Sequence, residues 1–239
     1  MGISTIFHQN LWYNISMPRQ NRVAAGNTVY HVINRSNGRV AIFNTDADYR
    51  HFESLLEEGK ELIGMRIFSY CIMPNHWHLV LYPKSDTDMG EFMRWVTTTH
   101  VRHRRTRTNS VGEGHLYQGT YKSFPVETSD YLVQLIRYVE QNPLRAKLVD
   151  RAVDWKWSSL WRREKGTEKE KKLLAKLPIE LPKDYALSVN EIYTPETLEK
   201  IRYSVNKGAP WGTESWTTGM VKKYGMESTL RGVGRPKQG

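Results

Sequence analysis

The chain has 239 residues, enough for one or two domains with a sizeable core. Its 35 lysines and arginines against 25 acidic residues give a net charge of +10, so its surface attracts polyanions, of which nucleic acid is the commonest. A single cysteine excludes an intrachain disulfide framework and a thiolate zinc cluster, and with no secretory signal or bilayer-length apolar run we expect a soluble protein of the cytoplasm with no membrane partner.

The first expected elements are a strand and a helix behind an N-terminal extension. Residues 1–16 show no clear period and are expected to lie ahead of the folded domain. Residues 28–34 are rich in β-branched and aromatic side chains, which predicts a strand. Apolar residues at helical spacing predict a helix over 46–58, with Gly59 as its stop signal.

Two strands with a pair of histidines follow. Strands are expected over 65–73 and 76–83, joined by the turn residues Pro74-Asn75. Side chains two positions apart in a strand share a face, so the imidazoles of His76 and His78 should project together, about 6 to 7 Å apart at their Cα atoms. Such a pair can bind a divalent cation. Two ordinary strand histidines beside a tryptophan would give the same pattern.

A second helix is expected over 89–105, followed by a strand over 116–126. The end of this helix carries four arginines within six residues: Arg102, Arg104, Arg105 and Arg107. Such a cluster suits phosphates or base edges in a groove. The alternative is a solvated helix end whose positive charge complements the helix dipole.

The helix predicted over 129–142 carries a tyrosine and an asparagine one turn apart. Its apolar residues follow the i, i+3, i+4, i+7 spacing of an amphipathic helix, and Pro143 favours a boundary at Asn142. Tyr138 and Asn142 lie about 40° apart on the helical wheel, so a phenol and an amide can reach the same point. Alternatively, Tyr138 flanks the core and Asn142 only ends the helix.

The order strand, helix, strand, strand, helix, strand, helix predicts an α+β fold. We expect a ferredoxin-like or RRM-like antiparallel sheet with helices on one face, formed by residues 17–162, and a C-terminal accessory region. Residues 163–195 mix charges and prolines and are expected to be a linker or accessory segment. Residues 196–239 are basic and predict two short helices that could dock on DNA, although the last ten also fit a flexible basic end.

Three motifs in chain order resemble one protein family. They are Met73-Pro-Asn-His-Trp-His78, Gly114-His-Leu-Tyr-Gln-Gly-Thr-Tyr-Lys-Ser-Phe-Pro125 and Tyr138-Val-Glu-Gln-Asn-Pro-Leu-Arg-Ala146. Together they resemble the REP-associated tyrosine transposases, relatives of the single-tyrosine transposases within the HUH endonucleases. The likeness covers about residues 17–162 and a tail within 208–236, and HUH domains have the sheet architecture predicted above.

The resemblance implies a chemistry for these residues. A Mg²⁺ or Mn²⁺ ion would be held by His76, His78 and Asn142, a position where related enzymes carry glutamine. Tyr138 would attack a phosphodiester of single-stranded, hairpin-forming DNA and form a 5′-phosphotyrosine, releasing a 3′-hydroxyl. The protein would work as a monomer or a homodimer. The expected DNA-binding side chains are the four helix-end arginines and two cations inside the shared motifs: Arg102, Arg104, Arg105, Arg107, Lys122 and Arg145.

Two other functions fit the same sequence. One is a domesticated protein that binds palindromic DNA without cutting it, although such a protein would not need the histidine pair and Tyr138. The other is a metal-dependent phosphodiesterase that uses water and forms no covalent adduct. Tyr117, Tyr121 and Tyr131 compete for the role of nucleophile, but the family places its tyrosine four residues before an Asn-Pro pair, which selects Tyr138.

Overall fold

The centre of the protein is a four-stranded antiparallel sheet. The computed structural model describes residues 23–110, 112 and 114–230. Its strands are β1 (Val29–Arg35), β2 (Arg66–Met73), β3 (His76–Tyr82) and β4 (Lys122–Val126). They lie in the order β2-β3-β1-β4, and each neighbouring pair is antiparallel. The predicted α+β fold with a ferredoxin-like sheet is confirmed.

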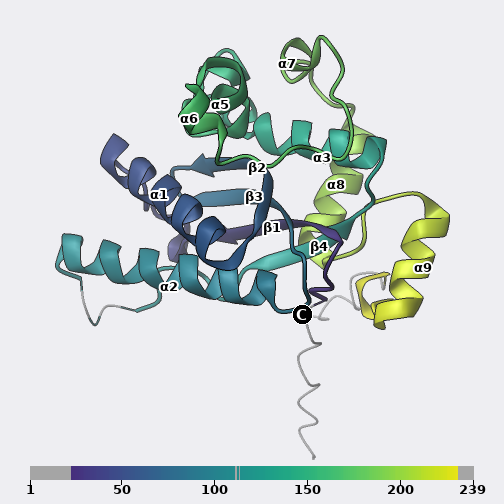
Figure 1. Cartoon of the computed structure of the whole chain (residues 1–239), viewed down its shortest axis with the longest axis horizontal. Coiled ribbons are helices and arrows are strands. Elements are labelled where there is room, and N and C mark those ends of the chain that lie inside the picture. Colours follow the sequence, from purple (N-terminus) through teal and green to yellow (C-terminus); the bar gives the residue numbers. More distant parts are fainter. Residues whose placement is uncertain (1–22, 111, 113, 231–239) are drawn as a thin grey trace, which may run out of the picture.

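Helices cover both faces of this sheet. α1 (Asp46–Ile63) and α2 (Asp88–Thr108) pack against each other on one face, as expected. α3 (Asp130–Glu140) lies on the opposite face, against β2 and β3 (Figure 1). The expectation of helices on one face therefore holds for α1 and α2 but not for the tyrosine helix, because both faces of the sheet carry buried apolar residues.

The alternation of strand side chains divides the core into two layers. Tyr30 and Trp77 belong to the layer under α1 and α2. Val80 and Phe124 belong to the layer under α3. Since successive strand residues point to opposite faces, His31, His76 and His78 lie on the α3 side of the sheet.

Gly59 does not stop the first helix. α1 continues to Ile63 and ends at Gly64, which adopts the left-handed conformation with φ 75°. A Cβ atom on Gly59 would lie 3.0 Å from Cε2 of Phe92, so this glycine lets α1 and α2 approach closely. A glycine required for packing and a glycine that caps a helix look alike in the sequence.

The segment before β4 is a loop rather than the start of a strand. Regular pairing begins only at Lys122, and Tyr117 joins Ser36 through an isolated bridge. The buried Tyr117 hydroxyl accepts a hydrogen bond from Trp77 Nε1 at 3.0 Å and bonds His100 Nδ1 at 2.7 Å. These partners fix the loop between α2 and β4.

Asn142 marks a bend rather than the end of helical structure. α3 ends at Glu140, and the short helix α4 (Asn142–Arg145) begins with Pro143 in its first turn. A proline at the start of a helix has no amide hydrogen to lose, so it supports a new helix after interrupting the old one.

The rest of the chain consists of short helices that pack on the sheet domain. The α-helices are α5 (Ser159–Lys165), α6 (Glu168–Lys171), α7 (Tyr185–Ser188), α8 (Pro195–Lys207) and α9 (Glu214–Tyr224). The 3₁₀ helices are η1 (Asn37–Arg39), η2 (Ala152–Asp154) and η3 (Glu227–Leu230).

Residues 163–195 pack against the sheet domain. Leu173, Tyr185 and Val189 are buried within the two core layers. The two helices expected near the C-terminus are present as α8 and α9, whereas the expected extension over 1–16 and the last nine residues lie outside the described part of the chain. Within the described ranges, no helix is both long and apolar enough to cross a membrane.

Candidate active site

Strand pairing brings three histidines together on the α3 side of the sheet. His76 and His78 share this face of β3, with ring centroids 5.1 Å apart. His31 reaches them from β1, and its ring centroid lies 5.1 Å from that of His78. The predicted histidine pair therefore shares one side, and His31 is a third member that the sequence reading missed.

Hydrogen bonds orient all three imidazoles. His31 Nε2 and His78 Nδ1 are 2.9 Å apart, and His76 Nδ1 lies 2.7 Å from Asn75 Oδ1. When His78 donates through Nδ1, its Nε2 keeps a lone pair. Nε2 of His78 is buried and has no hydrogen-bond partner among the described residues. A buried imidazole nitrogen left in this way suits metal coordination.

Burial keeps the histidines uncharged. Burial lowers the pKa of His31 to about 3, and burial together with the charges of Arg35 and Arg145 lowers the pKa of His76 to about 3. Burial also lowers the pKa of His78 well below its ordinary value, assisted by the two neighbouring histidines. A neutral imidazole is the form that binds metal ions, so these rings are ready for a cation at neutral pH.

Helix α3 places Tyr138 against the histidines. The side chain of Ser129 caps the start of α3 by accepting from the backbone N–H of Tyr131, and the apolar residues of α3 pack on the sheet. The ring centroid of Tyr138 lies 6.1 Å from that of His78 and 6.5 Å from that of His31, edge to face in both pairs. Tyr138 is mostly buried, and its ring faces the histidines.

Arg145 and Asn142 hold the end of α3. Asn142 Nδ2 donates to the backbone carbonyls of Tyr138 and Val139 at 3.1 and 3.0 Å. Arg145 donates to Asn142 Oδ1 at 2.8 Å and to the Tyr138 carbonyl at 3.1 Å. Burial lowers the pKa of Arg145 from its ordinary value. Both side chains thus brace the backbone that carries Tyr138.

A buried carboxylate anchors the same helix to the rest of the protein. Glu140 is fully buried and accepts hydrogen bonds from Ser69 at 3.3 Å and from Tyr185 at 2.7 Å. Ser159 and Arg163 also donate to this carboxylate. β2, α5 and α7 therefore fix α3 through one side chain.

The donor set at this site suits a divalent cation. The structure describes no group of three or more His, Cys, Asp or Glu side chains placed to hold a metal. A site with two histidine ligands needs another donor. The side-chain carbonyl oxygen of Asn142 has two lone pairs, and one of them accepts a hydrogen bond from Arg145. Asn142 as a metal ligand stays a prediction, and so does the identity of the ion as Mg²⁺ or Mn²⁺. The unpaired Nε2 of His78 is an imidazole donor, which transition metals accept more readily than Mg²⁺ does.

The arginine cluster at the end of α2 is partly neutralised. Arg104 pairs with Asp48 at 3.6 Å, and Arg107 pairs with the same carboxylate. Arg105 donates to the carbonyl of Gly114, and Arg102 is exposed. The sequence could not reveal the role of Asp48, because this residue comes from α1 and meets the cluster only in the folded protein.

Two further cations border the histidines. Lys122 is exposed at the start of β4 and lies opposite Ile33 in the pairing, while Ile33 lies opposite His78. Arg35 lies opposite His76, and its buried Nε has no partner within the described part of the chain. Arg35 was missed. Strand alternation alone would have placed it on the face of His31, but its proximity to His76 depends on register.

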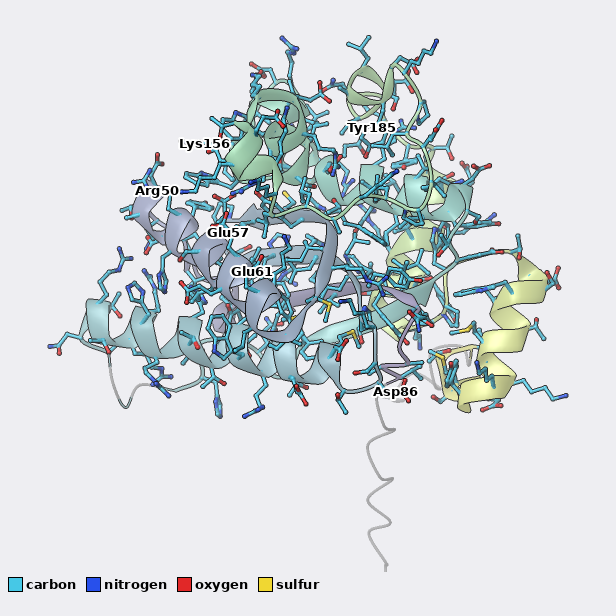
Figure 2. The ribbon with its side chains drawn as sticks, in the orientation of Figure 1. Arg50, Glu57, Glu61, Asp86, Lys156 and Tyr185 are labelled. Carbon is cyan, nitrogen blue, oxygen red and sulfur yellow. The ribbon has the colours of Figure 1, made fainter. Side chains whose placement is uncertain are left out.

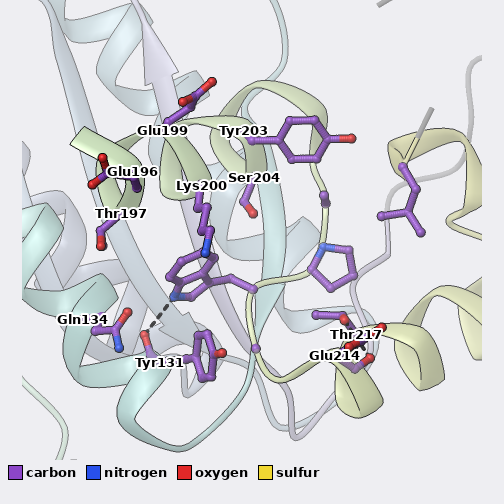
Figure 3. Close-up of a pocket in the computed structure, with 15 residues that line it drawn as sticks. Tyr131, Gln134, Glu196, Thr197, Glu199, Lys200, Tyr203, Ser204, Glu214 and Thr217 are labelled. Carbon is purple, nitrogen blue, oxygen red and sulfur yellow. Dashed lines mark hydrogen bonds between the residues drawn. The ribbon is translucent and has the colours of Figure 1, made fainter. Parts of the chain in front are cut away.

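A pocket of about 860 Å³ lies apart from these residues, between α3, α8 and α9. Figure 3 shows Glu196, Glu199 and Glu214 among its lining side chains, with Trp211 Nε1 donating to the Tyr131 carbonyl at 3.2 Å. None of the histidines lines it. Its lining has three carboxylates and one cation, Lys200, so its net negative charge would repel DNA phosphates and it is not a candidate for the DNA site.

Comparisons with known proteins give a family for this chain and a solved structure with a similar fold. Residues 24–142 match the family of IS200-like transposases. The solved structure of a REP-associated tyrosine transposase bound to a REP hairpin is similar over 66% of this chain and 87% of that one, with 17% identity and a TM-score of 0.50. A solved structure from Deinococcus radiodurans R1, described as a candidate transposase, matches 51% of this chain and 95% of that one, with 17% identity and a TM-score of 0.37. No curated protein sequence matches the chain.

The family match spans the whole sheet and the helix with Tyr138 and ends at Asn142. It confirms the resemblance given by the motifs, and the REP-associated structure shares the fold. Through residues 24–142, the chain belongs to the IS200-like transposase family.

Proposed function

We propose that the protein is a metal-dependent single-strand DNA endonuclease and strand transferase that works through a 5′-phosphotyrosine. The observation that carries this proposal is the position of Tyr138, whose ring faces His78 and His31 at 6.1 and 6.5 Å. A phenol beside neutral imidazoles can meet a phosphodiester that a cation holds against the same imidazoles.

The covalent step exchanges one phosphate ester for another. The Tyr138 oxygen forms a bond to phosphorus, and the bond from phosphorus to the 3′ oxygen of the neighbouring nucleotide breaks. The phenol loses its proton, and the departing 3′ oxygen gains one. Because the phosphotyrosine bond conserves the energy of the phosphodiester, a 3′-hydroxyl can reverse the step and join a strand without ATP.

His76 and His78 would hold the cation, with Asn142 as the proposed third ligand. When bound, Mg²⁺ or Mn²⁺ would polarise the scissile phosphate and neutralise the charge that develops there. His31 keeps His78 oriented through the 2.9 Å hydrogen bond. Arg145 places positive charge beside the Tyr138 ring, which favours the developing negative charge on the phenol oxygen.

The proposed substrate is a hairpin-forming single strand. This choice is supported by the net charge of +10, by the sequence motifs and by the related structure, which was solved with a REP hairpin. Arg102, Arg105 and Lys122 are the proposed DNA contacts among the predicted cations. Arg104 and Arg107 are bound to Asp48, and Arg145 braces α3.

The site is proposed to work within a single chain. Glu140 ties the tyrosine helix to β2, α5 and α7 of the same chain, and Gln141 Nε2 donates to the Val189 carbonyl at 2.9 Å. In this structure all of these contacts are made within one chain, without a second copy. A monomer that cuts with its own Tyr138 is therefore the proposed form.

The test is incubation of the protein with a labelled hairpin oligonucleotide and Mn²⁺, followed by denaturing electrophoresis. We expect a DNA-linked protein band that is absent from Tyr138→Phe and present in Tyr131→Phe, a control on the same helix. Cleavage without an adduct in both variants would identify a phosphodiesterase. Binding without cleavage by the unaltered protein would identify a palindrome-binding protein that does not cut.

A further inference from the structure

Two neighbouring cavities meet at the edge of the sheet beside the histidines. One, of about 390 Å³, lies between β1, the start of β4 and α8, and is lined by Ile33, Arg35 and Lys122. The other, of about 820 Å³, lies along α2 and is lined by Arg94, Arg105 and His115. Both cavities are also lined by Asn34 and by the loop 118–121, so they form one trough over the rim of the sheet.

The trough has the charge of a polyanion site. Its lining includes four cationic side chains: Arg35, Arg94, Arg105 and Lys122. No aspartate or glutamate is among the described residues that line it, in contrast to the pocket between α3, α8 and α9. Phosphates are therefore attracted along its whole length.

Strand register joins the trough to the proposed catalytic centre. His78, Ile33 and Lys122 form one row across β3, β1 and β4, and directly paired residues share a face. Adjacent strands lie about 4.8 Å apart, so Lys122 is about 10 Å from His78 along this row. Arg35, opposite His76, keeps a buried Nε without a partner in the described chain, which leaves a donor for a phosphate.

The far end of the trough can accept bases. Met93, Val101 and Leu116 give the cavity beside α2 an apolar part, while Gln118 and His115 are exposed at its rim. Asn34 Nδ2 donates to the Gly119 carbonyl at 3.2 Å, which fixes the loop. An apolar surface with amide and imidazole groups at its edge suits unpaired bases, whose faces stack and whose edges form hydrogen bonds.

We propose that the unpaired DNA next to the scissile phosphate runs from the histidines past Arg35 and Lys122, over the loop 118–121, into the cavity beside α2. The flank of the hairpin is thereby bound separately from its stem. This inference rests on the proposed function for the position of the scissile phosphate, but its test measures binding and needs no cleavage.

The binding test uses the full chain with Tyr138→Phe, so that no DNA is cut. Fluorescence anisotropy compares a blunt hairpin with hairpins that carry a 5′ or a 3′ single-stranded flank. Arg94→Ala and Gln118→Ala are expected to weaken binding of one flanked hairpin about fivefold to tenfold and to leave the blunt hairpin unchanged. Arg50→Ala removes an exposed cation of α1 outside the trough and should change neither affinity (Figure 2).

Two results would overturn the proposal: equal losses of affinity for blunt and flanked hairpins, or no loss for any of them. Thermal unfolding of each variant separates a lost contact from a lost fold. A missing covalent adduct in the unaltered protein would refute the proposed chemistry while these affinities still report on the trough.

Photocrosslinking locates the flank directly. Hairpins with 5-iodouracil in the flank are irradiated with the protein and digested with trypsin. Cleavage after Arg107 and Lys122 gives one peptide, residues 108–122, which includes the whole loop of the trough. We expect the crosslink in this peptide, and crosslinks confined to peptides of α1 or α9 would contradict the path.

Discussion

Arg145 lies over the ring of Tyr138, with its guanidinium carbon 4.2 Å from the ring centroid. The same side chain donates to the Tyr138 carbonyl and to Asn142 Oδ1. One cation thus contacts the proposed nucleophile at its ring and at its backbone, and this cation is the last residue of the short helix α4.

Replacing Arg145 should slow cutting more than it weakens binding. Arg145→Met removes the charge beside the ring and the hydrogen bonds to α4, and we expect the rate of adduct formation to fall about tenfold to hundredfold. Arg145→Lys keeps the charge but loses the planar set of donors, so its rate of adduct formation should lie between those of the unaltered protein and Arg145→Met. Single-turnover kinetics with labelled hairpin measure this, and an equal loss in affinity would instead make Arg145 a DNA contact.

His31 should control metal affinity without being a ligand. His31→Phe removes the partner of His78 Nδ1 and is expected to weaken Mn²⁺ binding about tenfold to hundredfold, measured by electron paramagnetic resonance titration. His31→Gln can restore one hydrogen bond and should recover part of the affinity. Phe124→Leu changes only the ring that packs on His31, so unchanged Mn²⁺ binding is expected there.

Stability should fall with acid below pH 6.5. Burial lowers the pKa of His31, His76 and His100 from 6.5 to about 3. As the pH falls, the unfolded chain therefore takes up protons first. The contribution of these neutral histidines to the free energy of unfolding is complete above pH 6.5. It is lost progressively between pH 6.5 and pH 3, by about 1.4 kcal/mol per pH unit for each such histidine. Urea unfolding at pH 7 and pH 5 measures the loss, and equal stabilities at both would refute it.

The buried Glu140 should contribute more to the free energy of unfolding than Glu57, a half-exposed partner of another arginine. Glu140→Gln keeps the shape but removes a fully buried charge that faces Arg163, with an expected loss of about 3 kcal/mol. Glu57→Gln is the control, because Glu57 pairs with Arg162 at 3.1 Å but its side chain is 50% exposed, and less than about 1 kcal/mol is expected. Similar losses in urea unfolding would show that Glu140 is not the anchor of α3.

Sequence patterns predicted elements more accurately than their ends. The strand with His76 and His78 was predicted at its observed start, because alternation is set by near neighbours. Gly59 and Pro143 misled the reading of two helix ends. Whether a glycine caps a helix or admits a neighbouring side chain depends on Phe92, which lies on another helix.

In the candidate site too, local patterns could be read from the sequence, whereas contacts between distant elements could not. His76, His78 and Tyr138 were found through spacing and motif, and the fold places their rings side by side. His31 and Arg35 were missed because nothing local to β1 reveals which residues of β3 lie opposite. Arg104 and Arg107 were predicted to bind DNA, but both pair with Asp48, which partly neutralises their charge.

By itself the sequence determined the alternating faces of the strands, the amphipathic tyrosine helix and the basic character of the chain. These properties depend on residues a few positions apart and on composition. Only the tertiary structure decided that α3 covers the face opposite α1 and α2, that His31 supports His78, and that Arg145 lies over Tyr138. Such contacts join residues distant in sequence, and they are set by register and by the packing of a shared core rather than by local preference.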